Sequence, residues 1–333
     1  MKVYNSFEKL DMCEELYTYL DNIRNERNFN VEEYVDKKCD ILNYYMSKNY
    51  LSACVVAVSG GIDSSTVLSL VNKASQKENS PIKKIVPIGM PIYDSVGVTN
   101  QRDAASKAKI LCNELKLDYI ETDLSEVNKE YRNLIESKLK IGPDAWAIGQ
   151  LGPYSRTPMI CYVNTLLNYS GYKSISVGTT NRSEFGYIGY VGKFSDEAVD
   201  VQLISDIYKS QVVEVAKYLN VPDFIISATP RGDMFDNRSD EQVFGASYDF
   251  LELYCEYLNL DKDLQDKFKK SLSKKAKDEF EIFGENLETL HEYNLHKYMS
   301  KSPAIHLDLF DASIKGGIDN YYDITKKLLY SKN

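Results

Sequence analysis

A run of small and β-branched residues that ends in a glycine-rich turn is the feature that most constrains how this chain can fold. Residues 53–58 read Ala-Cys-Val-Val-Ala-Val, a continuous apolar run typical of a parallel strand buried on both faces. A helical pattern begins soon after it. Between the two lies the turn Ser59-Gly60-Gly61-Ile62-Asp63-Ser64-Ser65. A strand, a tight turn and a helix in this order predict the first unit of an α/β fold.

The same alternation of strand and helix continues along the chain. Further strands are predicted at 84–88, 117–124 and 174–178. Helices between them are predicted at 98–116 and 151–168. Such alternation gives right-handed crossovers, so we expect an α/β fold with a Rossmann-like parallel sheet and helices on both faces. Charged amphipathic segments at 5–49 and from residue 240 onward predict helical additions at both ends.

The charge balance and the cysteine content argue against several classes of protein and of metal site. The chain has 40 Lys and Arg against 49 Asp and Glu, a net charge of −9, which argues against nonspecific binding of nucleic acid or anionic membranes. No apolar run approaches the length of a membrane-spanning helix. The six cysteines stand singly and only three histidines are present, so a zinc site or iron–sulfur cluster is not expected. We expect a cytoplasmic protein with neither nucleic acid nor membrane as a partner.

The glycine-rich turn is suited to binding an anion. Two consecutive glycines let backbone N–H groups approach a ligand closely, and the following helix adds its positive dipole end. Pyrophosphate is such an anion, although neither a Walker loop nor Gly-x-Gly-x-x-Gly is present. Alternatively, Ser59 and Asp63 serve only as helix caps. A second polar cluster, 179–184, also follows a predicted strand, so both clusters should meet at the carboxyl edge of the sheet.

The turn resembles the pyrophosphate loop of the N-type ATP pyrophosphatases, which include NAD synthetase, GMP synthetase, asparagine synthetase and several tRNA-modifying enzymes. Residues 177–184, Val-Gly-Thr-Thr-Asn-Arg-Ser-Glu, look like the Gly-Thr-x-Asn-x-x-Glu segment of NAD synthetase. The match continues at that family's spacing in Lys193, Asp196, Asp200, Lys209-Ser-Gln-Val and His296-Lys297. The resemblance extends over residues 35–305 and implies an adenine nucleotide alpha hydrolase-like fold.

The resemblance also implies a reaction and an organisation. The nicotinate carboxylate of deamido-NAD would be adenylated by ATP with release of pyrophosphate, and ammonia would then displace AMP to give NAD. The residues before Ser59 are too few for a separate glutamine amidase, so free ammonia is the expected nitrogen donor. Members of this type are homodimers. We expect an N-terminal helical extension at 1–49, an ATP pyrophosphatase domain at 50–305 and a tail at 306–333.

Matching positions imply the residues that handle ATP and the metal. The phosphates would lie against Gly60, Gly61 and Ser64 in the turn. Asp63 and Glu184 would hold Mg²⁺, since hard carboxylates suit a hard cation. Other expected contacts to ATP come from Ser59, Ser65, Thr179 and Lys209.

The acceptor side of the site is implied in the same way. Arg156, Lys193 and Asp200 would bind deamido-NAD, and His296 and Lys297 would close over the dinucleotide. Asp196 would lie near the ammonia. The residues expected to act in catalysis are Asp63, Lys193 and Asp196.

Several segments depart from the family pattern and leave alternatives open. The family's Asn-x-x-Ala-Arg-x-Arg reads Gly-Pro-Tyr-Ser-Arg-Thr-Pro at 152–158, so only Arg156 remains. Gly89 replaces a frequent arginine, and 230–234 read Pro-Arg-Gly-Asp-Met. The alternatives are a related ligase that adenylates another carboxylate, a tRNA-modifying pyrophosphatase and a nucleotide sensor without enzymatic activity. The acidic balance and the absence of paired cysteines disfavour the tRNA enzyme.

Overall fold

The computed structural model describes residues 10–93, 101–142, 145–192, 194–232, 238–297, 304–311 and 314–315. Its centre is a six-stranded sheet in the order β3-β2-β1-β4-β5-β6 in which every neighbouring pair is parallel. The strands are β1 (Ala53–Ala57), β2 (Lys84–Gly89), β3 (Ile120–Glu121), β4 (Ser174–Gly178), β5 (Val201–Gln202) and β6 (Ile305–His306). The predicted Rossmann-like parallel sheet is therefore confirmed.

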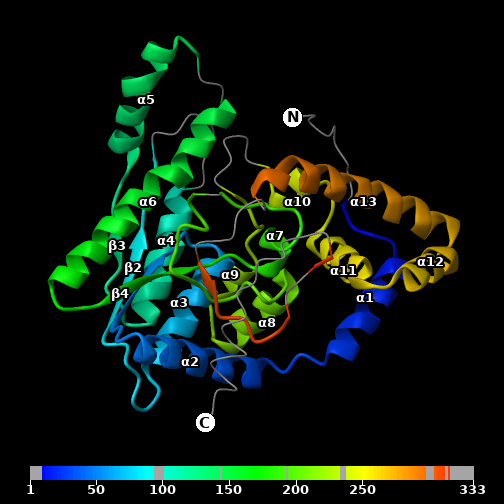
Figure 1. The fold of residues 1–333 in the computed structure, drawn as a ribbon, viewed down its shortest axis with the longest axis horizontal. Coiled ribbons are helices and arrows are strands. Elements are labelled where there is room, and N and C mark those ends of the chain that lie inside the picture. Colours follow the sequence, from blue (N-terminus) through cyan, green and yellow to red (C-terminus); the bar gives the residue numbers. More distant parts are fainter. Residues whose placement is uncertain are drawn as a thin grey trace.

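Helices cover both faces of this sheet (Figure 1). They are α2 (Val31–Lys48), α3 (Ile62–Ser75), α4 (Gln101–Glu114), α5 (Ser125–Leu139), α6 (Ala145–Tyr169), α7 (Arg182–Phe185), α8 (Lys209–Tyr218) and α9 (Asp223–Ile226). A further group of helices packs around its own apolar core beside the sheet. These are α1 (Glu14–Arg27), α10 (Asp240–Phe244), α11 (Tyr248–Asn259), α12 (Lys262–Ser271) and α13 (Lys274–Asn294), with the 3-10 turn η1 (Leu295–Lys297) after α13.

Strand β1 shows why its sequence is continuously apolar rather than alternating. Cys54 and Val56 belong to the core shared with α2, α3 and α8, whereas Val55 packs toward α6 in a second core. Both faces of the strand are buried, so both sets of side chains are apolar. No described helix is long and apolar enough to cross a membrane.

The strand order creates the position for a ligand site. β1 pairs with β2 on one side and with β4 on the other, so the chain leaves β1 in one direction and later returns on its opposite side. At such a switch point the turns that follow the two central strands diverge and leave a crevice at the carboxyl edge. The turns after β1 and β4 are the two polar clusters that the sequence singled out.

The edge strand β6 is joined to α2 by a buried cluster of charged groups. Lys38 Nζ lies 2.9 Å from Asp206 Oδ1 and donates to the Leu307 carbonyl oxygen at 2.6 Å. Asp308 Oδ1 accepts from Ser205 Oγ at 2.7 Å, but its buried Oδ2 has no hydrogen-bond partner among the described residues. Burial, followed by the charge of Asp206, raises the pKa of Asp308 to about 7.

This cluster predicts a pH-dependent stability. A carboxyl whose pKa is higher in the folded than in the unfolded chain holds its proton more tightly when folded, so Asp308 makes the fold less stable as pH rises from about 4 through about 7. Asp308→Asn keeps an acceptor for Ser205 and removes the charge. We expect it to melt at a higher temperature than the wild type near pH 8, and the gain to vanish near about pH 4.

Thermal melts of both proteins across this pH range provide the measurement. Asp36→Asn, at a largely exposed carboxylate, is the control and should show no comparable trend. A melting difference for Asp308→Asn that stays constant with pH would contradict the assignment.

Candidate functional site

The turn after β1 has a backbone that requires its first glycine. Gly60 has φ +81°, and a Cβ there would lie 2.0 Å from the carbonyl oxygen of Ala104 at the start of α4. Ser64 Oγ donates to the Gly61 carbonyl oxygen at 3.2 Å and lies 3.2 Å from the Ser59 backbone nitrogen, which fixes the turn internally. Helix α3 begins at once, with Gly61 as its N-cap, so its N-terminal N–H groups lie in the same turn.

Three residues that the sequence predicts for the site, Asp63, Glu184 and Lys209, lie together, although they come from three different helices. Lys209 Nζ lies 2.6 Å from Asp63 Oδ2 and 2.9 Å from Glu184 Oε1. Asp63 is in the first turn of α3, Glu184 is in α7 directly after β4, and Lys209 is the first residue of α8. Asn181 Nδ2 donates to the second oxygen of Asp63 at 2.8 Å. The turns of the two central strands therefore do meet as predicted.

Asp240 and Tyr248 complete this cluster, although the sequence did not single them out for the site. Tyr248 Oη donates to Glu184 Oε1 at 2.8 Å and lies 3.0 Å from Asp240 Oδ2. Asp240 is nearly fully buried and accepts from Tyr190 Oη and from the Gly232 backbone N–H. Asp240 is the first residue of α10, and this helix begins at the site.

The cluster shifts the pKa values of its members. Burial, opposed by Lys209 and reinforced by Asp63 and Asp240, raises the pKa of Glu184 to about 7. Burial alone would lower the pKa of Lys209, but Asp63, Glu184 and Asp240 raise it above its ordinary value. The charged form of Lys209 is therefore favoured, whereas burial favours the protonated form of Glu184.

The donor set fits a magnesium ion that is bound together with phosphates. Asp63 and Glu184 offer hard carboxylate oxygens, and their side chains keep 19% and 16% of their surface exposed. No group of three or more His, Cys, Asp or Glu able to hold a metal occurs among the described residues. Mg²⁺ is commonly held by one or two carboxylates plus substrate phosphates and water. The ammonium of Lys209 already shows that a cation suits the space between the two carboxylates.

Other residues predicted to contact ATP or the acceptor lie around the same edge. Thr179 is half-buried directly after β4. Ser65 is in the first turn of α3, where its buried Oγ has no hydrogen-bond partner among the described residues. Arg156 extends from α6, and its Nε donates to the carbonyl oxygen of Met90, just beyond β2. Thus Arg156 reaches the carboxyl end of the sheet.

The remaining acceptor-side residues are less closely gathered. Asp196 Oδ2 accepts from the Gly192 N–H at 2.6 Å, whereas Asp200 Oδ2 accepts from the N–H and Oγ of Ser176, both at 2.7 Å. Ser176 is in the middle of β4, away from the carboxyl end of the strand where the Lys209 cluster lies. Among the described residues, no contact joins Asp200 to that cluster. Lys193 lies outside the described residues.

His296 and Lys297 form part of η1 at the end of α13. Lys297 Nζ donates to the carbonyl oxygens of Gly189 at 2.8 Å and Val191 at 2.6 Å. His296 is exposed. The structure thus joins the late His-Lys pair to the loop that leads toward Asp196, although the two are about a hundred residues apart in sequence.

Known proteins share both the sequence pattern and the fold. The chain matches the family model for NAD synthase over residues 34–297. The NH(3)-dependent NAD(+) synthetase of Methanococcus aeolicus is 30% identical over 239 residues, 71% of this chain and 87% of the relative. The enzyme of the same name from Thermococcus kodakarensis is 33% identical over 201 residues, 60% of this chain and 69% of the relative.

Solved structures extend the likeness to the fold. The NMN synthetase from Francisella tularensis has a TM-score of 0.60 at 24% identity, covering 81% of this chain and 96% of that one. The NH3-dependent NAD synthetase from Campylobacter jejuni has a TM-score of 0.57 at 20% identity with the same coverage. Since the family match includes the turn after β1, the turn after β4 and the start of α8, the chain belongs to the NAD synthase family.

Proposed function

We propose that this protein converts the nicotinate carboxylate of deamido-NAD into the amide of NAD, using ammonia and ATP and releasing AMP and pyrophosphate. The observation that carries the proposal is the Lys209 ammonium held between Asp63 and Glu184 at the switch point of the sheet. The relatives named NH(3)-dependent NAD(+) synthetase support the choice of acceptor and nitrogen donor.

The residues around the turn have the properties that adenylation requires. A carboxylate is a poor acyl donor, so its oxygen first attacks the α-phosphorus of ATP, the α–β bond breaks, and pyrophosphate leaves. The turn at Gly60 and Gly61, with Ser59, Ser64 and Ser65, would hold the departing phosphates. Bound Mg²⁺, held by Asp63 and Glu184, would neutralise the charge that develops on them. Lys209 and Thr179 would contact ATP directly.

The acceptor would lie on the opposite side of the same edge. We assign deamido-NAD to Arg156, Lys193, Asp200, His296 and Lys297, and the ammonia to the surroundings of Asp196. Support comes from the hydrogen bond that Arg156 of α6 donates to Met90, just beyond β2. The contact between Lys297 and the loop 189–191 adds to it. Ammonia attacks the carbonyl carbon of the acyl adenylate, AMP leaves with the former carboxylate oxygen, and a proton passes from the nitrogen to a base.

The nitrogen donor gives a direct test of this function. We expect the purified protein to form NAD from deamido-NAD and ATP with ammonium salts, and not with ammonia-free glutamine, because the relatives that match over most of their length are NH(3)-dependent. NAD is measured with a coupled dehydrogenase. Parallel reactions with other aromatic carboxylates test the alternative ligase. Equal rates with glutamine, or preference for another carboxylate, would overturn the assignment.

We also propose the organisation and the location of the protein. The catalytic unit would span 50–305, with 1–49 and 306–333 as additions, and the protein would be cytoplasmic. All six cysteines are free thiols, as is usual in reducing compartments.

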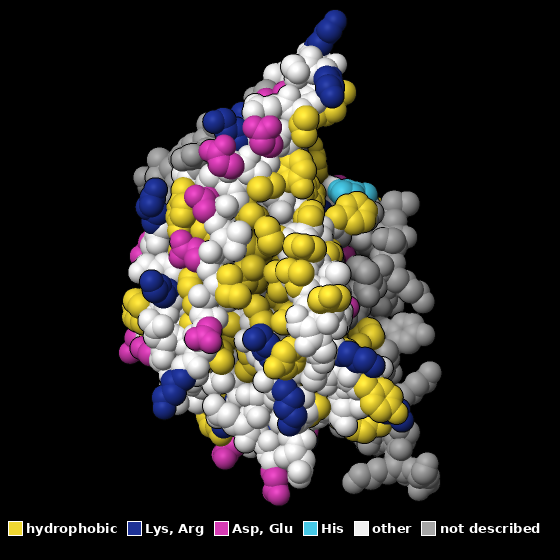
Figure 2. All heavy atoms as spheres, turned by 90° about the vertical axis from the view of Figure 1, so that its left-hand side faces the viewer, with side chains coloured by type: hydrophobic (Ala, Val, Ile, Leu, Met, Phe, Trp, Pro, Cys, Tyr) yellow, Lys and Arg dark blue, Asp and Glu magenta, His cyan; other side chains and the backbone are white. Residues whose placement is uncertain are grey.

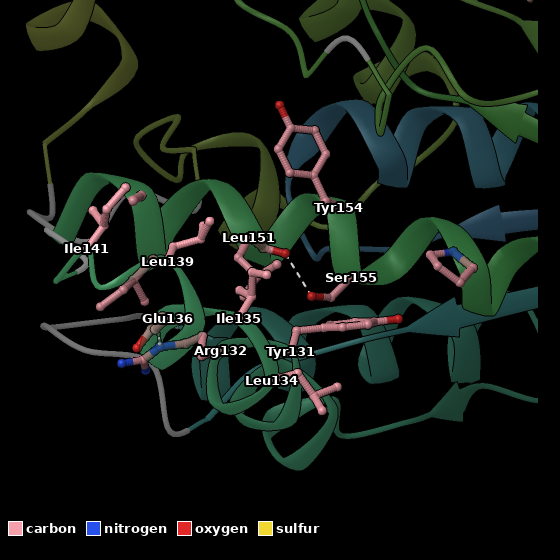
Figure 3. Close-up of a pocket in the computed structure, with 13 residues that line it drawn as sticks. Tyr131, Arg132, Leu134, Ile135, Glu136, Leu139, Ile141, Leu151, Tyr154 and Ser155 are labelled. Carbon is pink, nitrogen blue, oxygen red and sulfur yellow. Dashed lines mark hydrogen bonds and ion pairs between the residues drawn. The ribbon is translucent and has the colours of Figure 1, made fainter.

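A homodimer is proposed from an uncovered apolar face on α5 and α6. Figure 2 shows hydrophobic side chains gathered across this side of the molecule. They surround a groove of about 650 Å³ between the two helices (Figure 3). Large apolar side chains in or beside it that are 40–66% exposed are Tyr131, Leu134, Ile135, Leu139, Ile141 and Tyr154. Contiguous apolar surface of this kind marks an interface, and a second copy can cover it by two-fold symmetry.

The dimer is tested by breaking this face. We expect light scattering at micromolar concentration to give twice the 38.0 kDa chain mass, and Leu134→Glu to give the monomer because it places a charge in the groove. Leu264→Glu, at a similarly exposed leucine on α12, is the matched control and should remain dimeric. A wild-type monomer, or a dimer unaffected by Leu134→Glu, would refute this interface.

A further inference from the structure

The two sequence neighbours of Lys209 are both held by groups that lead to helix α1. Tyr208, the N-cap of α8, is fully buried, and the guanidinium of Arg27 lies over its ring at 5.0 Å. Ser210, on the other side of Lys209, donates from Oγ to Glu252 Oε2 at 2.7 Å. The first turn of α8 is therefore fixed immediately before and after the lysine.

Glu252 joins this turn to α1 through two arginines. It belongs to α11 and is 1% exposed. Arg24 Nη2 lies 2.7 Å from its Oε2, and Arg27 Nη1 lies 2.6 Å from its Oε1. Burial alone would raise the pKa of Glu252, but Arg24 and Arg27 hold it below its ordinary value. Glu252 is consequently a charged acceptor for Ser210, and its charge depends on α1.

Helix α1 lies outside the residues that match the NAD synthase family model. It covers Glu14–Arg27, whereas the NAD synthase match begins at residue 34. It packs against α11, which in turn contacts α7 and α8 (Figure 1). The contacts of Arg27 with Tyr208 and Glu252 thus connect a segment outside the family match to the residue that bridges Asp63 and Glu184.

We propose that α1 positions Lys209 for ATP, with Arg27 as the residue of α1 that contacts both Tyr208 and Glu252, and with Glu252 and Ser210 as the link to α8. The proposal rests on the proposed function in so far as Lys209 is an ATP contact. A lysine side chain has four rotatable bonds, so where its ammonium sits depends on how firmly its backbone is held. Misplacement by about 1 Å can cost up to about 10²-fold in activity. Arg27 stacks on Tyr208, the residue before Lys209. Arg27 also neutralises Glu252, which accepts a hydrogen bond from Ser210, the residue after Lys209.

The test is Arg27→Met in the full-length protein. We expect KM for ATP to rise about tenfold, with KM for ammonia and deamido-NAD unchanged, because only the cation that faces the phosphates is displaced. Calorimetric titration of the wild type and variant with Mg·ATP, in the absence of deamido-NAD, should show the same weakening. This titration tests the positioning even if deamido-NAD proves not to be the acceptor.

A matched control separates positioning from simple stabilisation. Arg27 joins the carboxylates of Glu252 and Glu256, and Lys77 joins two carboxylates in the same way, lying 2.6 Å from Asp36 and 2.5 Å from Asp40, but it is not part of the site. Lys77→Met should lower the melting temperature without changing ATP affinity. If Arg27→Met likewise lowered only the melting temperature, α1 would be a structural clamp and the proposal would be overturned.

Two further variants complete the test. Ser210→Ala removes the link to α8 while Glu252 stays paired with both arginines, so it should weaken ATP binding in the same direction even if Arg27→Met folds poorly. In a double-mutant cycle, Arg27→Met should add no further loss of ATP affinity when Lys209→Met is already present. Full additivity of the two losses, or unaltered ATP affinity in Ser210→Ala, would contradict the proposed route through Lys209.

Discussion

Asp63→Asn is expected to slow adenylation about 10²–10³-fold, corresponding to about 2.7–4 kcal/mol of transition-state stabilisation by analogy with the loss of a preorganised oxyanion donor. The substitution keeps the shape of the side chain but removes the charge that faces Lys209 at 2.6 Å. If Asp63 holds Mg²⁺ on the pyrophosphate, the loss should appear in the rate of adenylation more than in the affinity for deamido-NAD. Single-turnover measurement of AMP formation reports the rate.

Glu184→Gln should give a loss of the same kind, since both carboxylates contact Lys209 in the same cluster. Asp36→Asn is the matched control, because Asp36 also lies 2.6 Å from a lysine but outside the site. Thermal melting separates a fold defect from a chemical one. Near-normal turnover of Asp63→Asn at ordinary Mg²⁺ concentration would mean that the contacts of Asp63 with Lys209 and Asn181 are structural only.

Lys209→Met is the second change with a large expected effect. A charge-assisted hydrogen bond contributes roughly 1.5–3 kcal/mol, so loss of the ammonium should lower kcat/KM for ATP about 10- to 10²-fold. The side chain is only 8% exposed, so water replaces the lost charge poorly. Steady-state kinetics with ATP as the varied substrate, and Lys209→Arg as the conservative comparison, provide the measurement.

The pH profile of this variant gives an independent signature. Lys209 lowers the pKa of Glu184, which is nonetheless raised by burial to about 7. Without Lys209 the pKa of Glu184 should rise further. Since only the ionised carboxylate binds a cation well, the acid limb of the pH–rate profile should move to higher pH. An unchanged acid limb would show that Glu184 does not control the rate, and an unchanged kcat/KM for ATP would show that Lys209 is not an ATP contact.

The centre of the sheet could be predicted from sequence, but its edges could not. Strand β1 is an apolar run of five residues, strand β4 alternates serine with isoleucine and valine, and each is followed by a polar turn, which is a strong local signal. The segment 117–124 was predicted as a strand, yet only Ile120–Glu121 pairs with β2. Strands β5 and β6 have two residues each and exist because their neighbours offer hydrogen bonds. Such short pairings depend on tertiary context rather than on local propensity.

Helix α5 was not predicted, although its sequence carries a helical pattern. Its apolar residues, among them Leu134 at 58% and Ile135 at 49% exposure, are not covered within the chain. Val127, Tyr131, Leu134, Ile135 and Leu139 do recur at helical spacing, but the stripe that they form faces away from the core of the chain.

Some residues of the site could likewise be predicted from local motifs, whereas others depend on long-range packing. Asp63, Glu184 and Lys209 could be named from motifs, and the parallel sheet explains why the first two meet. Asp240 and Tyr248 join them from helices that pack beside the sheet, and it is this packing that brings the starts of the two helices to the site. The role of Arg27 likewise depends on the packing of α1 against α11, which no motif records.

The most direct test of the proposed reaction follows one oxygen atom. Deamido-NAD labelled with ¹⁸O in both oxygens of its nicotinate carboxylate is incubated with the protein, ATP, Mg²⁺ and ammonia, and the products are examined by mass spectrometry. Adenylation predicts one ¹⁸O in the phosphate of AMP for each NAD formed, none in pyrophosphate, and the second ¹⁸O in the amide of NAD. Label in pyrophosphate or inorganic phosphate, or NAD formed without labelled AMP, would contradict the adenylated intermediate and with it the roles assigned to Asp63, Glu184 and Lys209.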